Sequence, residues 1–383
     1  MQKYILALLV IFSAFFTTKI GLSPIYITFL TGVYLFLIIT FVRKKIYVNH
    51  LSLFVVLLIV SYFIAIQILP VHRINSGWIG IVFSLVYFIM VTCALHNVEK
   101  QHVFNISRVF VNFSIILLSV EAAWRIANPQ LPHMTDFEFY MAHMDQSFFE
   151  MSFYVYKFGS FMFRDSNSVG LVVISLFFFS YYLMRFHKQK YSIQLILLFI
   201  LCLLTLSRAA IVALIFSYLL FSILSKANRY IKPFFIIITA ISAIVILFVI
   251  LEDATLLSKF YIFNQSVQFL KTANILEILF GVGIEKSRNA LGIPAHNFII
   301  TYLIETGILG LFFISVFLAL ILYQSKYNAI YVMFPFLLTS MSATNLSTPY
   351  LYTIFAIIIF LERQYNVLAK ENINMENYVD NKT

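Results

Sequence analysis

The chain has 383 residues, of which 62% are hydrophobic and 11% charged, and its formal net charge is +10. A soluble domain carries about 25% charged residues, so this composition excludes a water-soluble globular protein and indicates a chain surrounded by lipid. Backbone amides in lipid must bond within their own segment or around a closed barrel. Because the apolar runs are continuous rather than alternating, we predict an all-α fold, a polytopic transmembrane helical bundle.

Apolar runs bounded by charges and turn residues predict about twelve spans in one integral membrane domain, residues 1–383. The first run is interpreted as a retained helix, because no small-residue cleavage site follows it. The predicted spans are Tyr4–Thr18, Leu22–Val42, Leu51–Leu69, Trp78–Leu95, Val109–Ile126, Phe161–Met184, Tyr191–Leu206, Ala209–Leu224, Pro233–Leu251, Asn297–Leu322, Ala329–Thr344 and Tyr350–Leu361. The two spans beside Ser207 and Arg208 are short, which favours a helix pair that does not cross at full thickness.

Basic residues predict the orientation of these spans, with both termini in the cytoplasm (N-in/C-in). Short loops containing Arg43–Lys45, Arg185–Lys190 and Lys226–Lys232 alternate with loops that hold few basic residues, as cytoplasmic loops do. The positive charge is therefore a topology signal, and it forms no patch for nucleic acid.

Two connections, residues 126–160 and 252–296, are then extracytoplasmic loops, and residues 362–383 form a polar, frayed cytoplasmic tail. Connections of this length are usually functional or disordered. Their aromatic residues and the helical apolar spacing of Leu256–Leu279 favour interfacial helices on the membrane surface. We therefore expect the function to lie on the outer face.

The outer ends of several spans carry polar side chains. Arg125 follows Glu121 by four residues, so a local ion pair is expected. Further along, Asp165 or Asn167 is a normal helix N-cap; in the alternative, Arg164 and Asn167 line a polar rim of a substrate groove.

The segment Leu206-Ser207-Arg208-Ala209 places an arginine between two apolar stretches. Such a residue is costly in lipid, which favours a functional role in anion binding over a structural one. A guanidinium group matches two phosphate oxygens at once. Ala209 and Ala210 are small enough to permit close helix packing.

Gly281 and Gly283 precede a second basic residue, Arg288, in the second long connection. Paired glycines allow a backbone to approach a ligand closely. They neither follow a strand nor complete GxGxxG, so a dinucleotide site is excluded.

His296 and Asn297 open a predicted span, and Glu305 lies two turns further along it. Asn297 is a candidate N-cap. His296 is either structural or a base, since a neutral imidazole can accept a proton from a sugar hydroxyl. Glu305 is buried by hydropathy, so it must orient His296, pair with an arginine or remain protonated.

Neither a metal site nor a cofactor site is expected. The spacings of His133 and His143 match no standard ligand pattern. There is no Walker motif and no internal repeat that would indicate a transporter. Cys93 and Cys202 lie in apolar runs and are expected to be core residues.

Taken together, Ser207-Arg208-Ala209, Gly281-Val282-Gly283 before a loop arginine, and His296-Asn297 followed by Glu305–Gly310 resemble the O-antigen ligase and polymerase superfamily. Its members include the Wzy-type oligosaccharide repeat-unit polymerases of bacterial surface polysaccharides. Phe163–Asn167 is similar to a short motif of that family that ends in Asn. The resemblance covers about Phe161–Gly310, and it departs from the family pattern at Ala209-Ala210, where glycine is frequent.

The resemblance implies a metal-independent glycosyltransferase in the bacterial cytoplasmic (inner) membrane, with an active site that faces the periplasm or exterior. Its donor and acceptor would be undecaprenyl-diphosphate-linked oligosaccharides of O-antigen or capsule synthesis, and a chain-length regulator would be a further partner. Arg208 and Arg288 would bind the diphosphate and His296 would act on the acceptor hydroxyl. The supporting residues would be Ser207, Asn297, Glu305, Asn167, Arg164, Gly281 and Gly283.

Four functions are compared on this basis. A polymerase transfers the growing glycan to another lipid-linked unit, whereas a ligase transfers it to a different acceptor. A lipid-linked oligosaccharide flippase or other transporter would need polar residues at mid-membrane along several spans, and here they cluster at outer ends. In a structural or assembly protein, Arg208 and His296 would pair only internally. Polymerisation is the function that we expect.

Overall fold

The computed structural model describes residues 2–14, 24–43, 47–68, 77–130, 156, 159–163, 165–226, 254–293, 295–342 and 347–380. Within these ranges the secondary structure is helical and contains no strand, which confirms the all-α fold class. The helices are α1 (Gln2–Phe12), α2 (Pro24–Arg43), α3 (His50–Ile68), α4 (Gly77–Leu95), α5 (Lys100–Ala127), α8 (Ser166–His187), α9 (Ser192–Leu204), α10 (Arg208–Lys226), α12 (Ala254–Thr272), α13 (Ile275–Phe280), α14 (Ser287–Leu291), α15 (Phe298–Gln324), α16 (Ile330–Thr339) and α17 (Pro349–Asp380).

A helix lies at each predicted span that falls within the described residues, and the predicted span Pro233–Leu251 falls outside them. By length and composition, five of these helices are able to cross a membrane: α3, α4, α5, α8 and α15. Shorter apolar helices accompany them, including α9 with 13 residues. At about 1.5 Å per residue α9 is about 20 Å long, shorter than a full span.

Two predicted boundaries differ most from the structure. Helix α5 begins at Lys100 instead of Val109, because its first turns are polar and hydropathy does not detect them. Helix α17 does not stop at Leu361 but continues to Asp380, so residues predicted as a frayed tail are helical. In the second long connection, α12 and α13 confirm the helical spacing predicted over Leu256–Leu279.

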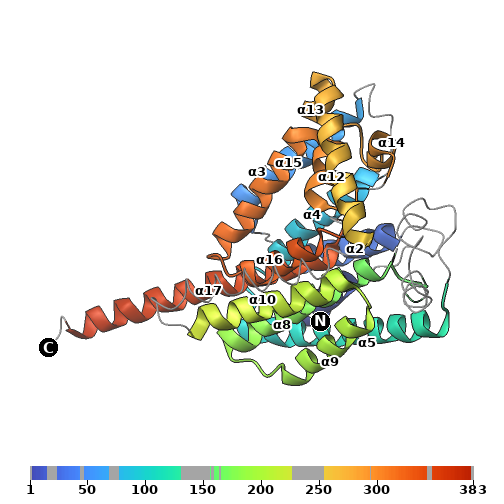
Figure 1. Cartoon of the computed structure of the whole chain (residues 1–383). Coiled ribbons are helices and arrows are strands. Elements are labelled where there is room, and N and C mark those ends of the chain that lie inside the picture. The colour runs from blue at the N-terminus through green and yellow to red at the C-terminus, as the bar shows by residue number, and fades with distance from the viewer. Residues whose placement is uncertain are drawn as a thin grey trace.

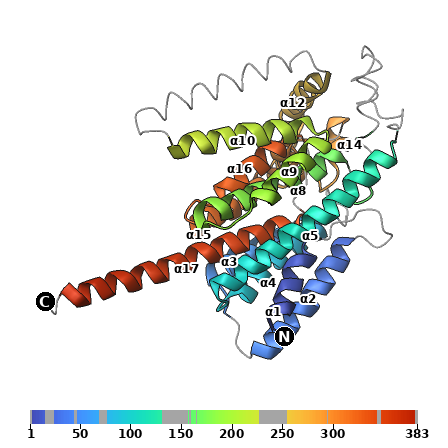
Figure 2. The same ribbon diagram turned by 90° about the horizontal axis from the view of Figure 1, so that it is seen from below.

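The bundle is built around α8 and the first part of α17. Side chains are buried all round α8 from Val169 to Leu183 and all round α17 from Tyr350 to Ile359, as expected for helices that are apolar on every face. Figure 2 shows α17 between α1, α2 and α5 on one side and α8, α9, α10 and α16 on the other. Figure 1 shows α12 and α13 beside α15, which both of them contact.

The outer helices direct large apolar side chains away from the bundle. Phe54 on α3, Ile193 on α9 and Phe312 on α15 are 64%, 71% and 57% exposed, and each has similar neighbours on its own helix. Soluble monomers rarely expose continuous apolar surface of this kind. The apolar helices and their exposed faces are consistent with a multi-pass membrane protein.

Contacts between helix ends gather polar residues at two opposite ends of the bundle. At one end, Arg43 Nη1 donates to His96 O at 3.0 Å and Arg363 Nη2 donates to Gln324 Oε1 at 2.7 Å. We call this the Arg43 end. The opposite end, which we call the Ser207 end, contains the last turns of α5, α9 and α16 and the first turns of α8, α10 and α15.

Candidate functional site

Helix α10 begins at Arg208, which is exposed, directly after a tight turn from α9. Leu206 in that turn has φ 55°. The hydroxyl of Ser207 is buried, donates to Asn167 Oδ1 at 2.7 Å and accepts from the amide of Ala210 at 3.3 Å. Ser207 therefore caps α10 and joins it to the first turn of α8.

Close packing supports the same junction. A Cβ built on Gly170 of α8 would lie 2.6 Å from the Cβ of Ala210, so the two helices touch at small residues, as predicted for the alanines after Arg208. Asp165 caps α8 by accepting from Ser168 N at 2.8 Å. This confirms Asp165 as the N-cap and leaves the side chain of Asn167 to bond Ser207.

The turn between α9 and α10 is held by Arg125, the last basic residue of α5. Arg125 is fully buried, and it donates to Leu204 O at 2.7 Å, to Thr205 O at 3.1 Å and to Tyr156 O at 3.0 Å. Its Nε lies 3.3 Å from Glu121 Oε1, which confirms the predicted ion pair. The bonds to the end of α9 were not predicted, because sequence spacing reveals only the neighbour on the same helix.

Asn297 is the N-cap of α15, as predicted, and accepts from the amides of Ile299 and Ile300 at 3.0 and 3.2 Å. Its Nδ2 lies 3.5 Å from the sulfur of Met341, in the turn after α16. The amide of Phe298 donates to Ser340 O at 3.0 Å in the same turn. His296, which is partly exposed, precedes this cap.

The turn Ser340–Ser342 connects two of the predicted motifs. Asn167 Nδ2 donates to Ser342 O at 3.5 Å, a weak bond, while Oδ1 of the same amide accepts from Ser207. Asn297 contacts Met341. The Ser207 motif and the His296 motif, far apart in sequence, thus meet at one turn. This turn was predicted to be part of the span Ala329–Thr344, but α16 ends at Thr339.

Helix α15 is interrupted at Gly307, where φ is 68° and ψ is −176°. The interruption releases the carbonyls of Ile304 and Glu305 from their helical partners. They accept instead from the amides of Val282 and Gly283, at 2.9 and 3.0 Å. Buried backbone groups at membrane depth require such replacement partners, so the glycine loop completes the broken helix.

Gly281 and Gly307 are both required by this contact. Gly281 has φ 78°, and a Cβ there would collide with the backbone of Glu305 and Thr306. A Cβ on Gly307 would collide with the backbone of Leu279 and Phe280. The close approach predicted for a ligand at Gly281 is therefore an approach to α15 itself.

Glu305 is buried, and its Oε1 accepts from Ser287 Oγ at 2.6 Å and Ser287 N at 3.3 Å. The partner that these bonds give to Glu305 is Ser287, which is neither the histidine nor an arginine among the predicted partners. This bond attaches the start of α14 to α15, and exposed Arg288 follows directly. Asn297 and Glu305 are about 12 Å apart along the axis of α15, at about 1.5 Å per residue.

The predicted residues gather at two places along α15. At its start, Asn297 contacts Met341, and the same turn contacts Asn167, which bonds Ser207. Further along, Gly281, Gly283 and Ser287 surround Glu305. Each predicted active-site residue is the sequence neighbour of one of these bonded residues: Arg208 follows Ser207, Arg288 follows Ser287 and His296 precedes Asn297. Arg164 lies outside the described residues.

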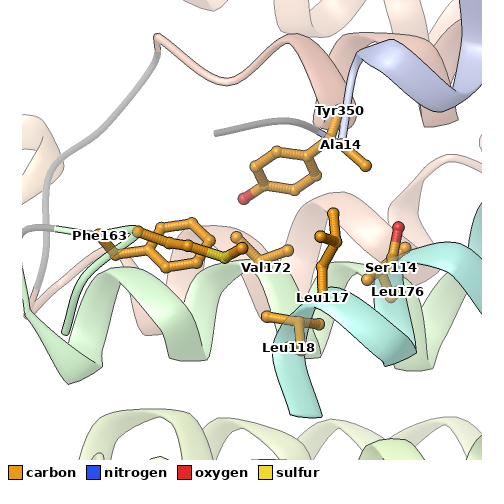
Figure 3. A pocket seen from close by; sticks show the side chains of 9 residues that line it. Ala14, Ser114, Leu117, Leu118, Phe163, Val172, Leu176 and Tyr350 are labelled. Carbon is orange, nitrogen blue, oxygen red and sulfur yellow. The ribbon is translucent and has the colours of Figure 1, made fainter. Parts of the chain in front are cut away.

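A small apolar cavity lies between α5, α8 and the start of α17, and Figure 3 shows the Tyr350 ring above it with Phe163 at one side. Its interior volume is about 10 Å³, room for about one water molecule. The lining does not include Arg208, Arg288 or His296. The cavity is too small for a sugar.

The chain was compared with protein-family models, with curated proteins and with solved structures, and none of the three comparisons gives a match.

Proposed function

We propose that this protein is a polymerase of a bacterial surface polysaccharide. It transfers a glycan from undecaprenyl diphosphate to a sugar hydroxyl of another lipid-linked repeat unit. In this proposal the chain crosses the cytoplasmic membrane about twelve times with both termini inside, and the Ser207 end faces outward, where lipid-linked repeat units are joined.

The observation that carries the proposal is the meeting of separate polar motifs at one turn. Two residues of these motifs contact the turn Ser340–Ser342 directly: Asn167 of α8 and Asn297, the N-cap of α15. The third, Ser207 at the start of α10, is joined to the turn through Asn167. A bundle that only anchors the chain does not require polar residues of three helix ends to be joined. An active site requires such contacts, because it must hold charged and acid–base groups in a fixed geometry.

The chemistry follows from the groups beside these anchors. The donor leaves as a lipid diphosphate, so negative charge develops on the leaving group as the glycosidic bond breaks. Exposed Arg208 and Arg288 supply guanidinium donors that stabilise this charge. His296 accepts the proton of the attacking hydroxyl, which makes the oxygen a better nucleophile.

The break in α15 fits this chemistry. Interrupted helices at membrane depth are tolerated where the backbone is buried in protein or lines a polar space. The interruption at Gly307 fixes the loop that leads to Ser287 and Arg288. Arg288 is therefore carried on a rigid attachment and not on a free loop.

The test is replacement of Arg208 or His296 by alanine in the bacterial host, with polysaccharide length measured on gels and protein level by immunoblot. Loss of transition-state donors of this type slows reactions by about 10²–10³, so polymer should disappear while protein level stays normal. Matched controls are Lys190→Ala and His50→Ala, which are exposed and lie away from the Ser207 end.

The products distinguish the alternatives. A polymerase defect leaves a single repeat unit on its final acceptor, whereas a ligase defect leaves long lipid-linked chains. Arg288→Lys should also fail, because lysine cannot replace a bidentate guanidinium contact. Normal polymer length in Arg208→Ala or His296→Ala would refute the catalytic assignment.

A further inference from the structure

A second pocket, with charged side chains in its lining, lies at the Arg43 end, opposite the candidate site. Its interior volume is about 160 Å³, and it is lined by Lys3, Leu6, Arg43, Asn97, Val98, Glu99, His102 and Ile106. The first residues of α1, the last residue of α2 and the first turns of α5 thus surround one space. It is large enough for several water molecules or a compact polar headgroup.

The charge of this pocket is mainly positive. Lys3 and Arg43 form no ion pair with any acidic side chain in the part of the chain that the structure describes. Glu99, the carboxylate of the pocket, lies 2.8 Å from His102 Nδ1. The N-terminus of α5, which has no side-chain cap, adds a partial positive charge.

The surroundings of the pocket are also positive. Burial lowers the pKa of His96 first, and the charges of Arg43 and Arg363 lower it further. His96 lies just beyond α4, and its carbonyl accepts from Arg43. An anion in this pocket would therefore meet two cationic side chains, Lys3 and Arg43, and one carboxylate, Glu99, which lies beside His102.

The position of the pocket favours a lipid over a soluble anion. Beside Lys3, Tyr4 is 77% exposed, and beside Arg43, Phe41 is 87% exposed. The basic residues thus stand at the edge of the apolar surface of α1 and α2. A phospholipid can place its phosphate between the basic groups while its acyl chains cover this surface.

We propose that this pocket binds the phosphate of an anionic phospholipid headgroup, with Lys3 and Arg43 as its cationic contacts. The bound lipid fastens α1 and α2 to the start of α5. The site is separate from the candidate catalytic end and takes a different ligand, so it does not depend on the proposed polymerase activity.

The experiment titrates the purified protein in detergent with phosphatidylglycerol, phosphatidylcholine or inorganic phosphate and counts bound molecules by native mass spectrometry. Phosphatidylglycerol should saturate one tight site that the other two ligands do not fill. Each basic residue near a lipid headgroup contributes about a fivefold change in affinity, so Lys3→Gln should weaken this site about fivefold. Lys3→Gln combined with Arg43→Gln should weaken it about thirtyfold.

Two further variants distinguish binding in this pocket from nonspecific attraction to the positive charge at this end. Lys188→Gln with Lys190→Gln removes the same charge from the same end but lies outside the pocket, so it should change the affinity by less than about twofold. Glu99→Gln should tighten binding, a gain that misfolding cannot produce. Equal losses in the control pair, equal binding of phosphatidylcholine, or inorganic phosphate that binds as tightly as the lipid would each overturn the proposal.

Discussion

Replacement of Arg125 by alanine should be one of the most destabilising single changes at the Ser207 end. The variant leaves the fully buried carboxylate of Glu121 without its cation and leaves Leu204, Thr205 and Tyr156 carbonyls without a donor. Breaking a buried pair in this way costs about 3–5 kcal/mol of unfolding free energy. Each bond to a charged donor is worth about 1.5–3 kcal/mol, so the estimate is conservative.

Unfolding can be followed by tryptophan fluorescence in mixtures of sodium dodecyl sulfate and a mild detergent. Trp124 adjoins Arg125 and packs against Phe161 at 5.7 Å between ring centroids, so it reports the region directly. A Trp78→Phe background removes the other tryptophan. Arg185→Ala is the comparison, a partly exposed arginine of the opposite end that donates to Phe221 O. It leaves no buried carboxylate without its cation, so it should cost less than Arg125→Ala.

A second substitution distinguishes a buried charge from lost packing. Glu121→Leu with Arg125→Met removes both charges, and such replacements of buried pairs are often neutral or stabilising. The double variant should therefore recover at least about 2 kcal/mol relative to Arg125→Ala. A cost below about 1 kcal/mol for Arg125→Ala, or a double variant no more stable than the single one, would refute the reasoning.

Three further changes test the anchors, each by the same unfolding measurement. Gly307→Ala should cost about 1–3 kcal/mol, because alanine is strained at positive φ, and a cost near zero would mean that α15 is not interrupted there. Glu305→Gln keeps an acceptor for Ser287 and should be nearly neutral, whereas Glu305→Leu orphans the buried hydroxyl and should cost about 1–3 kcal/mol; equal effects would contradict the described bond. Asn167→Ala removes the acceptor of Ser207 and should cost about 1 kcal/mol while shortening the polymer at normal protein level, and full-length polymer would count against Asn167 as a support of the site.

The amino-acid sequence determined the helical class and where most helices lie. Lipid cannot solvate a backbone, so each long apolar run has to be a helix. Local signals were also readable, because a cap depends on amides two or three residues away. Asn297 is the cap it was predicted to be, and Asp165 is one of the two predicted candidates for the cap of α8. The pair of Glu121 and Arg125 followed from helical spacing alone.

The tertiary structure decided what the polar residues bind. The sequence left the partner of Glu305 undetermined. Only the fold brings Ser287, eighteen residues away, into contact with it. Gly307 gave no sign of a broken helix, because the break depends on amides that a separate loop supplies. The meeting of Asn167 and Asn297 at the turn after α16 depends likewise on packing between distant helices. Burial in lipid requires a helix but does not select its neighbours, and these contacts are set by which helices pack together.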